Sequence, residues 1–274
     1  MTRTQAGDRP PPIDWHTTVA AIWRSRQEVL RPVRRIAPLH LDDLLGIEDQ
    51  KAALLRNTER FLADLPANHA LLWGARGTGK SSLVKALLNH LAPRGLRLIE
   101  VDRADLVDLP DIVDLICAEP FRFLVFCDDL SFETGDPSYK ALKTILEGSI
   151  ELPPDNVLFY ATSNRRHLMP EAMEDNLQAR VVGTELHHAE AVEEKIALSD
   201  RFGLWLSFHP IDQDLYLRMV DACFGDWSGD RAELHRQALR FALLRGGRSG
   251  RAAAQFHRQM VGPVDDEALM GDRG

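Results

Sequence analysis

The sequence has few cysteines and no long apolar run, and these two absences limit what the protein can be. Its three cysteines, Cys117, Cys127 and Cys223, are odd in number and scattered over the 274 residues, and no pair has the spacing of metal ligands. Apolar neighbours suggest that Cys117 and Cys127 are buried free thiols. No stretch approaches the roughly 20 apolar residues of a membrane span, and MTRTQAGDRPPP lacks the apolar run of a secretory signal. We therefore expect a cytoplasmic protein with no membrane partner.

Positive charge is also in short supply, because 33 basic residues face 41 acidic ones and the formal net charge is −8. Phosphate neutralisation requires clustered positive charge, so this balance argues against broad nucleic-acid binding. A local basic face is left open by a group of arginines near the N-terminus: Arg24, Arg26, Arg31, Arg34 and Arg35.

The N-terminal segment, residues 1–38, is expected to be disordered over residues 1–14, which are polar and contain three consecutive prolines. Residues 15–35 are predicted to form an amphipathic helix, because apolar residues alternate there with the arginines. We interpret it as a docking helix with a solvated arginine face, with a partner or nucleic-acid contact as the alternative.

Residues 39–210 alternate between apolar strands and helical segments, which predicts an α/β domain with a parallel sheet covered by helices on both faces. The strands are expected at 69–73, 96–101, 123–127, 156–162 and 204–208. After Pro210 the strands stop, and three helices separated by glycine-rich loops predict a small helical domain at 211–262. An acidic flexible tail is expected at 263–274.

The segment from Gly74 to Ser81 fits the pattern G-x-x-x-x-G-K-[ST] in full, between a predicted strand and a predicted helix. Glycines let backbone N–H groups converge on an anion, the helix start adds a positive dipole end, and Lys80 adds a full charge for the β- and γ-phosphates. The Ser81 hydroxyl is suited to Mg²⁺. The pattern predicts ATP and Mg²⁺ binding by this set: Gly74, Ala75, Arg76, Gly77, Thr78, Gly79, Lys80, Ser81 and Ser82.

Two acids, Asp128 and Asp129, directly follow the apolar strand at 123–127. Buried acids at the carboxyl end of a strand need a partner, and a metal ion provides one. We assign Asp128 to the metal and Asp129 to the general base that polarises the attacking water. The alternative interpretation is a pair of acids that cap a turn.

With these motifs the sequence resembles the AAA+ ATPases over residues 39–261, because the glycine-rich segment corresponds to their Walker A motif and Asp128-Asp129 corresponds to their Walker B motif. The resemblance implies that Asn164 is the sensor 1 residue that orients the attacking water, and that Arg201 in SDRFG is an arginine finger for a neighbouring subunit. It also implies that Arg251 of Ser249-Gly250-Arg251 is sensor 2, with Arg248 as the competitor, and that Ile47 packs on the adenine. The segments CDDLSFE, SYKALKTILEGSIE, LFYATSNRRHLMPE and SDRFGLWLSF resemble a bacterial AAA+ family catalogued as a domain of unknown function.

One departure from the AAA+ pattern concerns catalysis, because most members carry Glu where this sequence has Asp129. The arm is shorter by one CH₂, which favours slow hydrolysis or help from Glu133. The leading hypothesis is an ATP-hydrolysing module that assembles with copies of itself and remodels an unknown protein client. A DNA-associated initiator- or loader-like ATPase and an ATP-binding switch with little turnover are the alternatives.

Overall fold

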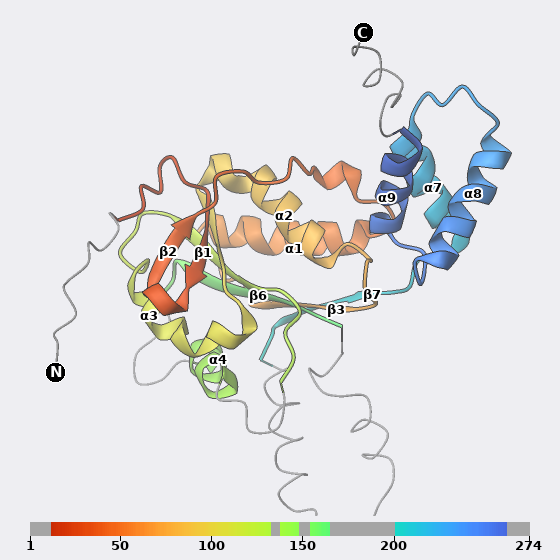
Figure 1. The fold of residues 1–274 in the computed structure, drawn as a ribbon. Helices are drawn as coiled ribbons and strands as arrows, with labels where there is room; N and C mark the ends of the chain where they lie inside the picture. The colour runs from red at the N-terminus through yellow and green to blue at the C-terminus, as the bar shows by residue number, and fades with distance from the viewer. Residues whose placement is uncertain (1–11, 133–137, 148–153, 165–200, 262–274) are drawn as a thin grey trace, which may run out of the picture. The chain divides into compact units, whose positions relative to one another are not determined.

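The structure is a computed structural model that describes residues 12–132, 138–147, 154–164 and 201–261 (Figure 1). The chain separates into two compact units. The first contains the chain up to Gly74 and from Lys80 to Ser207, and the second contains residues 75–79 and the chain from Phe208 onward. The predicted disorder of residues 1–14 falls mostly, and the predicted tail at 263–274 entirely, outside the described residues.

The first unit is built on a seven-stranded sheet with the order β2-β1-β4-β5-β6-β3-β7. Strands β1, β4, β5, β6 and β3 run parallel, and β2 is antiparallel to β1. The fold is therefore α/β, as predicted. The strands are β1 (Ala20–Arg24), β2 (Val29–Pro32), β3 (Ala70–Gly74), β4 (Leu96–Glu100), β5 (Arg122–Cys127), β6 (Val157–Ser163) and β7 (Leu204–Phe208).

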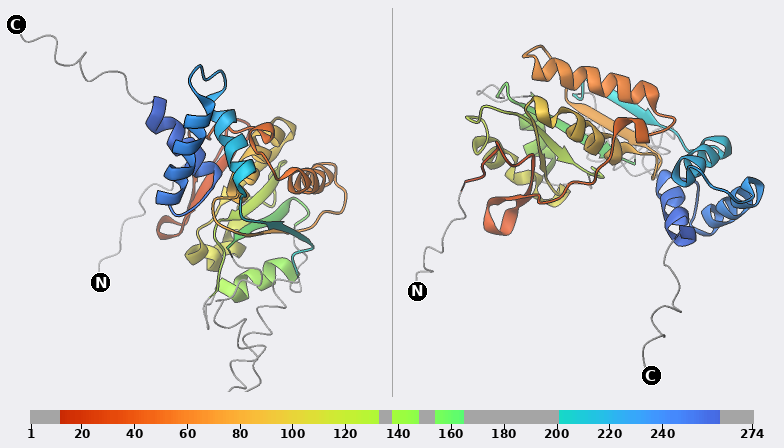
Figure 2. Two further views of the ribbon diagram at one scale, coloured as in Figure 1. Left: turned by 90° about the vertical axis from the view of Figure 1, so that its right-hand side faces the viewer. Right: turned by 90° about the horizontal axis from the view of Figure 1, so that it is seen from above.

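Helices cover both faces of this sheet, which explains why β5 and β6 are apolar without alternation. Helices α1 and α2 lie on one face, and α3 and α4 lie on the other (Figures 1 and 2). The α-helices are α1 (Glu48–Leu62), α2 (Lys80–Leu91), α3 (Leu109–Asp114) and α4 (Ser138–Glu147). Short 3₁₀ turns lie in the connections between strands and helices, namely η1 (Ser25–Gln27), η2 (Leu41–Asp43), η3 (Ala92–Arg94) and η4 (Arg103–Asp108).

The helix predicted over residues 15–35 is wrong, because this segment forms the hairpin of β1 and β2. Ala21 and Trp23 are buried, whereas Ile22 is half-buried and Arg24 is exposed, so the side chains alternate with the period of a strand. Glu28 ends the 3₁₀ turn with a φ of 51°, a left-handed conformation that reverses the chain. The apolar residues that suggested one helical face therefore lie on opposite faces of a sheet.

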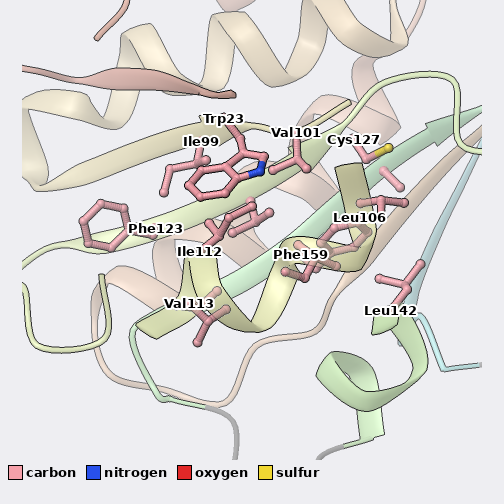
Figure 3. Packing of buried hydrophobic residues seen from close by; sticks show 14 of the residues in the cluster. Trp23, Ile99, Val101, Leu106, Ile112, Val113, Phe123, Cys127, Leu142 and Phe159 are labelled. Atoms are coloured by element: carbon pink, nitrogen blue, oxygen red, sulfur yellow. The ribbon is translucent and has the colours of Figure 1, made fainter. Parts of the chain in front are cut away.

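A buried apolar cluster holds the hairpin to the rest of the unit (Figure 3). Trp23 is 3% exposed and packs in the same cluster as Ile99 of β4, Ile112 of α3 and Phe123 of β5. Its indole Nε1 donates a hydrogen bond to Asp108 Oδ2 at 2.8 Å, so the one polar atom of the ring is satisfied. The N-terminal hairpin is thus an integral part of the α/β core.

The second unit contains three helices with a core of their own: α7 (Gln213–Phe224), α8 (Arg231–Leu244) and α9 (Gly250–Val261). Each starts at a side-chain cap, in which Asp212, Asp230 and Ser249 accept hydrogen bonds from backbone N–H groups of the first turn. Tyr216 is fully buried and donates to the carbonyl oxygen of Ala238 at 3.1 Å. The sequence predicts these helices at about 212–224, 230–244 and 249–261, so the observed bounds agree to within one residue.

Two expectations from composition can be compared with the described residues. No helix among them is both long enough and apolar enough to cross a membrane. Cys127 is buried, and that burial raises the pKa of its thiol, as expected for an inert neutral group. Cys117 is exposed, so its predicted burial is wrong; it follows the short helix α3 on a turn that faces solvent.

Candidate functional site

The glycine-rich loop connects β3 to α2, as the motif requires. Gly74, Gly77 and Gly79 have φ values of 129°, 75° and 99°, a region that side-chain-bearing residues rarely adopt. Thr78 Oγ1 donates to the Ala75 carbonyl oxygen at 2.8 Å and braces the turn. Lys80 then begins α2, so the loop ends at a helix N-terminus whose N–H groups suit an anion.

Lys80 and Asn164 lie together, although 84 residues separate them in the chain. Lys80 is 7% exposed, and its Nζ donates to the Gly74 carbonyl oxygen at 2.8 Å and to Asn164 Oδ1 at 3.3 Å. Asn164 directly follows β6, which is adjacent to β3 in the sheet. The sheet order therefore explains why the Walker A lysine and the predicted sensor 1 residue meet.

Ser81 and Asp128, the two predicted metal ligands, are in direct contact. The Ser81 hydroxyl donates to Asp128 Oδ1 at 2.6 Å. A hydroxyl and a carboxylate are the hard oxygen donors that Mg²⁺ prefers, and Mg²⁺ keeps several waters and phosphate oxygens in its shell. The described residues contain no cluster of three or more His, Cys, Asp or Glu side chains that could hold a metal alone. The pair therefore fits a Mg²⁺ ion that arrives with a nucleotide.

Asp129, the predicted general base, is held beside Asn164. Its backbone has a φ of 56°, a left-handed conformation that Asp tolerates better than most residues. Asn164 Nδ2 donates to Asp129 Oδ1 at 2.5 Å, and the Asp129 N–H donates to Thr162 Oγ1 at 2.9 Å. Five of the predicted residues thus form one cluster at the carboxyl ends of β5 and β6 and the start of α2: Lys80, Ser81, Asp128, Asp129 and Asn164.

Thr162 also belongs to this cluster, although the sequence motifs assign it no role in the site. Its hydroxyl donates to Asp128 Oδ1 at 2.5 Å and accepts the bond from the Asp129 N–H. A polar residue directly after the apolar run Val157–Ala161, two positions before Asn164, was the available signal. Threonine also favours strands, so the residue type alone did not separate a structural from a functional position.

Within the second unit, Gly77 of the loop lies against Ser249 at the start of α9. A Cβ atom on Gly77 would come within 2.6 Å of Ser249 Cβ, so the Ser249 side chain leaves no room for a side chain at position 77. The Ser249 hydroxyl accepts a hydrogen bond from the Ala252 N–H at 3.0 Å and caps the helix. Arg248 and Arg251, the two candidates for sensor 2, flank this contact, and both are exposed.

The remaining predicted residues lie in other segments. Ile47 is 7% exposed and stands immediately before α1, and Ser82 is half-buried in the first turn of α2. Arg201 is half-buried in the turn that precedes β7. Glu133 and the residues before Arg201 in the SDRFG segment lie outside the described residues.

A protein-family model matches nearly the whole chain. The family described as "Protein of unknown function (DUF815)" matches residues 16–264. The chain belongs to the DUF815 family. No curated protein matched this DUF815 chain.

Solved structures identify the fold of the DUF815 chain. It is similar to a lysine-to-arginine point mutant of Thermotoga maritima RuvB, with a TM-score of 0.52 and 14% identity over 86% of this chain and 68% of that one. The Thermotoga maritima RuvB Holliday junction branch migration motor gives a TM-score of 0.51 and 15% identity, covering 87% and 68%. A proline-to-glycine point mutant of the same protein gives 0.51 and 17%, covering 86% and 69%. The chain therefore has the AAA+ fold that the sequence predicted.

Proposed function

We propose that this protein binds ATP with Mg²⁺ and hydrolyses it. The observation that carries the proposal is the hydrogen-bonded connection from Lys80 through Asn164 to Asp129. It links the cation suited to the γ-phosphate with the carboxylate suited to activate water, through an amide that contacts both. Phosphoryl transfer needs positioning and charge stabilisation above all, and this cluster supplies groups for both.

Each residue has a role in the proposed reaction. The loop amides of residues 75–79 and the Lys80 ammonium bind the phosphates, and Ser81 and Asp128 hold the metal. Mg²⁺ bound there would neutralise the phosphate charge that increases in the transition state. Asp129 accepts a proton from the attacking water, while Asn164 orients that water through its amide.

Calorimetry and phosphate release with purified protein test this proposal. The wild type should bind ATP in the presence of Mg²⁺ and release phosphate, and Lys80→Ala should lose binding. Asp129→Asn should keep ATP binding, because Asn also tolerates a left-handed backbone, and should lose turnover by roughly 10²–10⁴-fold. Absence of ATP and ADP binding by the wild type would refute the function. Binding without turnover would leave an ATP-dependent switch.

We further propose that the protein self-assembles, and that Arg201 completes the site of a neighbouring copy and Arg251 contacts the nucleotide as sensor 2. The position of Arg201 just before β7 supports this role, because family resemblance places an arginine finger in that segment. An arginine finger increases turnover by roughly 10³–10⁵-fold. Arg201→Ala should therefore bind ATP normally and hydrolyse it far more slowly.

We also propose that the assembled protein remodels a protein client. The Asp129→Asn variant loaded with ATP is suited to retain this client, because it should bind ATP without hydrolysing it.

A DNA-associated ATPase is the second candidate, and the N-terminal hairpin is the observation that favours it. Arg24, Arg26, Arg31, Arg34 and Arg35 are all exposed. Within the described part of the chain none of them forms an ion pair. They lie at the end of β1, in the turn, on the outer strand β2 and directly after it. RuvB, which shares the fold, is described as a Holliday junction branch migration motor.

Filter binding to duplex and single-stranded DNA at two salt concentrations tests this candidate. If the hairpin contacts phosphates, affinity should fall steeply with salt, and Arg24→Gln with Arg31→Gln should reduce that salt dependence. Arg258→Gln in α9 is a matched control on the other unit. Absence of binding at low salt in the presence of ATP would eliminate the candidate.

A further inference from the structure

Thr162 connects to three consecutive residues that follow β5. Its hydroxyl donates to Asp128 Oδ1 at 2.5 Å and accepts from the Asp129 N–H at 2.9 Å. Its carbonyl oxygen accepts from the Leu130 N–H at 2.7 Å. Thr162 is 2% exposed, so water has little access to replace these contacts.

The geometry uses both capacities of the hydroxyl. A threonine hydroxyl has one proton to donate, and here it goes to Asp128, while a lone pair receives the Asp129 N–H. Asp128 Oδ1 accepts the Ser81 hydroxyl as well, at 2.6 Å, so two donors fix the direction of that carboxylate. The other connection holds the backbone of Asp129 in its left-handed conformation, with a φ of 56°.

We propose that Thr162 is a positioning residue that sets the metal-side carboxylate and the general base at the same time. This inference rests on the proposed function, because it assigns Thr162 a part in the same reaction. The base here is an aspartate, whose short arm cannot compensate by rotation for a displaced backbone. The hydroxyl of Thr162 therefore determines whether Asp129 reaches its water and whether Asp128 faces the metal.

The substitution Thr162→Val isolates the hydroxyl, because valine has nearly the same shape and keeps the backbone bond to Leu130. The Asp129 N–H then loses its acceptor, and Asp128 loses one of two donors. Thr162→Ser retains the hydroxyl and should rescue. Thr58→Val is the matched control, since the Thr58 hydroxyl is fully buried and bonded to the Leu54 carbonyl oxygen and to Tyr160 OH, outside the cluster.

Three measurements test the proposal: hydrogen exchange of the nucleotide-free protein, ATP affinity, and steady-state hydrolysis as a function of Mg²⁺. Thr162→Val should speed exchange at the Asp129 amide, lower kcat at least tenfold and raise the Mg²⁺ concentration for half-maximal rate several-fold. KM for ATP should change less than threefold, because the phosphate loop is untouched. Thr162→Ser should stay within threefold of wild type, and Thr58→Val should lower thermal stability without altering kcat or the Mg²⁺ dependence.

The outcomes separate this proposal from the proposed function. A wild type that hydrolyses ATP, with a folded Thr162→Val variant of equal kcat and equal Mg²⁺ dependence, overturns the role of Thr162 alone. A wild type that binds no ATP overturns the proposed function instead. If Thr162→Val does not fold, exchange of the wild type decides: a protected Asp129 amide supports the proposal, and rapid exchange there overturns it.

Discussion

Asp129 combines a left-handed backbone with a short carboxylate, and the two properties belong together. Asp adopts positive φ more readily than Glu, because its short polar side chain can form local hydrogen bonds. We predict that Asp129→Glu, which restores the commoner AAA+ residue, lowers kcat and also lowers the melting temperature. The extra CH₂ has to displace the Asn164 amide, which already lies 2.5 Å from Asp129 Oδ1. Steady-state kinetics with thermal melts measure both effects, and a faster, equally stable variant would contradict this account.

Gly77 is required for two reasons, its φ of 75° and the close approach of Ser249. Gly77→Ala should weaken ATP binding at least tenfold, since a Cβ would overlap Ser249 Cβ and an L-residue in this conformation costs about 1–2 kcal/mol. Calorimetric titration with ATP measures the loss.

Ser249→Gly provides the matched control for the Gly77 prediction. Glycine at a helix N-cap costs only a few tenths of a kcal/mol relative to serine. The double variant Gly77→Ala with Ser249→Gly should therefore recover part of the binding, because the overlap is gone and only the backbone strain remains. Strictly additive effects would mean that the two residues do not contact each other in solution.

We predict that His69 makes the free energy of unfolding depend on pH. Burial lowers the pKa of His69 to about 4 from an ordinary 6.5, and its Nδ1 accepts a hydrogen bond from the Phe159 N–H at 3.0 Å, which requires the neutral ring. Between pH 6.5 and 4 the unfolded chain binds this proton and the folded chain does not. The free energy of unfolding is therefore fully retained above pH 6.5 and should fall by up to about 3 kcal/mol as pH decreases toward 4.

Denaturant titrations at pH 7.5 and pH 5 measure this dependence. His69→Asn keeps an acceptor near the Nδ1 position and removes the titration, so this variant should lose clearly less stability than the wild type over the same interval. Equal pH dependence in the two proteins would assign the effect to other groups.

Among the elements, the hairpin of β1 and β2 differs most from its predicted form, and two adjacent residues distinguish the alternatives. In a helix Ile22 and Trp23 would share one apolar face, whereas in the strand they point to opposite faces. Trp23 is 3% exposed and Ile22 is half-buried, so Trp23→Ala should cost about 3–5 kcal/mol and Ile22→Ala clearly less. Unfolding in urea measures both, and equal costs would argue against the strand.

The elements that sequence predicted well are those whose pattern has one interpretation. Phe123 to Cys127 is a short apolar run bounded by polar residues, and only a strand buried on both faces suits it. The glycine loop before Lys80 fixes a strand before it and a helix after it. These two elements were enough to place Lys80, Ser81 and Asp128 at one edge of the sheet, whereas Asn164 was assigned through the resemblance to the AAA+ ATPases.

Local sequence patterns could not predict the hairpin or the role of Thr162, because both depend on contacts between segments that are distant in the chain. Residues 15–35 carry apolar and charged residues at spacings compatible with either period. Which period applies depends on β4, which pairs with β1 although the paired residues are 78 positions apart in the chain. The role of Thr162 depends likewise on a contact between β5 and β6. The structure of such segments depends on which strands they pair with, and a single sequence does not identify those strands.

At the scale of the whole molecule, the proposed sharing of sites between copies predicts complementation between inactive variants. Under this proposal Arg201→Ala keeps its own nucleotide site, and Lys80→Ala keeps Arg201 for the site of its neighbour. Mixing the two inactive proteins should restore part of the ATPase activity, because a Lys80→Ala neighbour completes the site of an Arg201→Ala subunit. Phosphate release across mixing ratios measures this, and a mixture no more active than its components would contradict a site shared between copies.

The position of β1 between β2 and β4 has a practical meaning for anyone who shortens this protein. A chain started at residue 39, where the pattern of alternating strands and helices begins, would lack a strand whose neighbour on one side is central to the sheet. The edge of β4 that pairs with β1 at Leu98, Ile99 and Glu100 would then have no partner strand, and the indole-sized space beside Ile99 and Phe123 would be empty. Such a fragment should expose an unpaired sheet edge that associates with other chains, and it should therefore precipitate, even though every nucleotide-binding motif is still present in it.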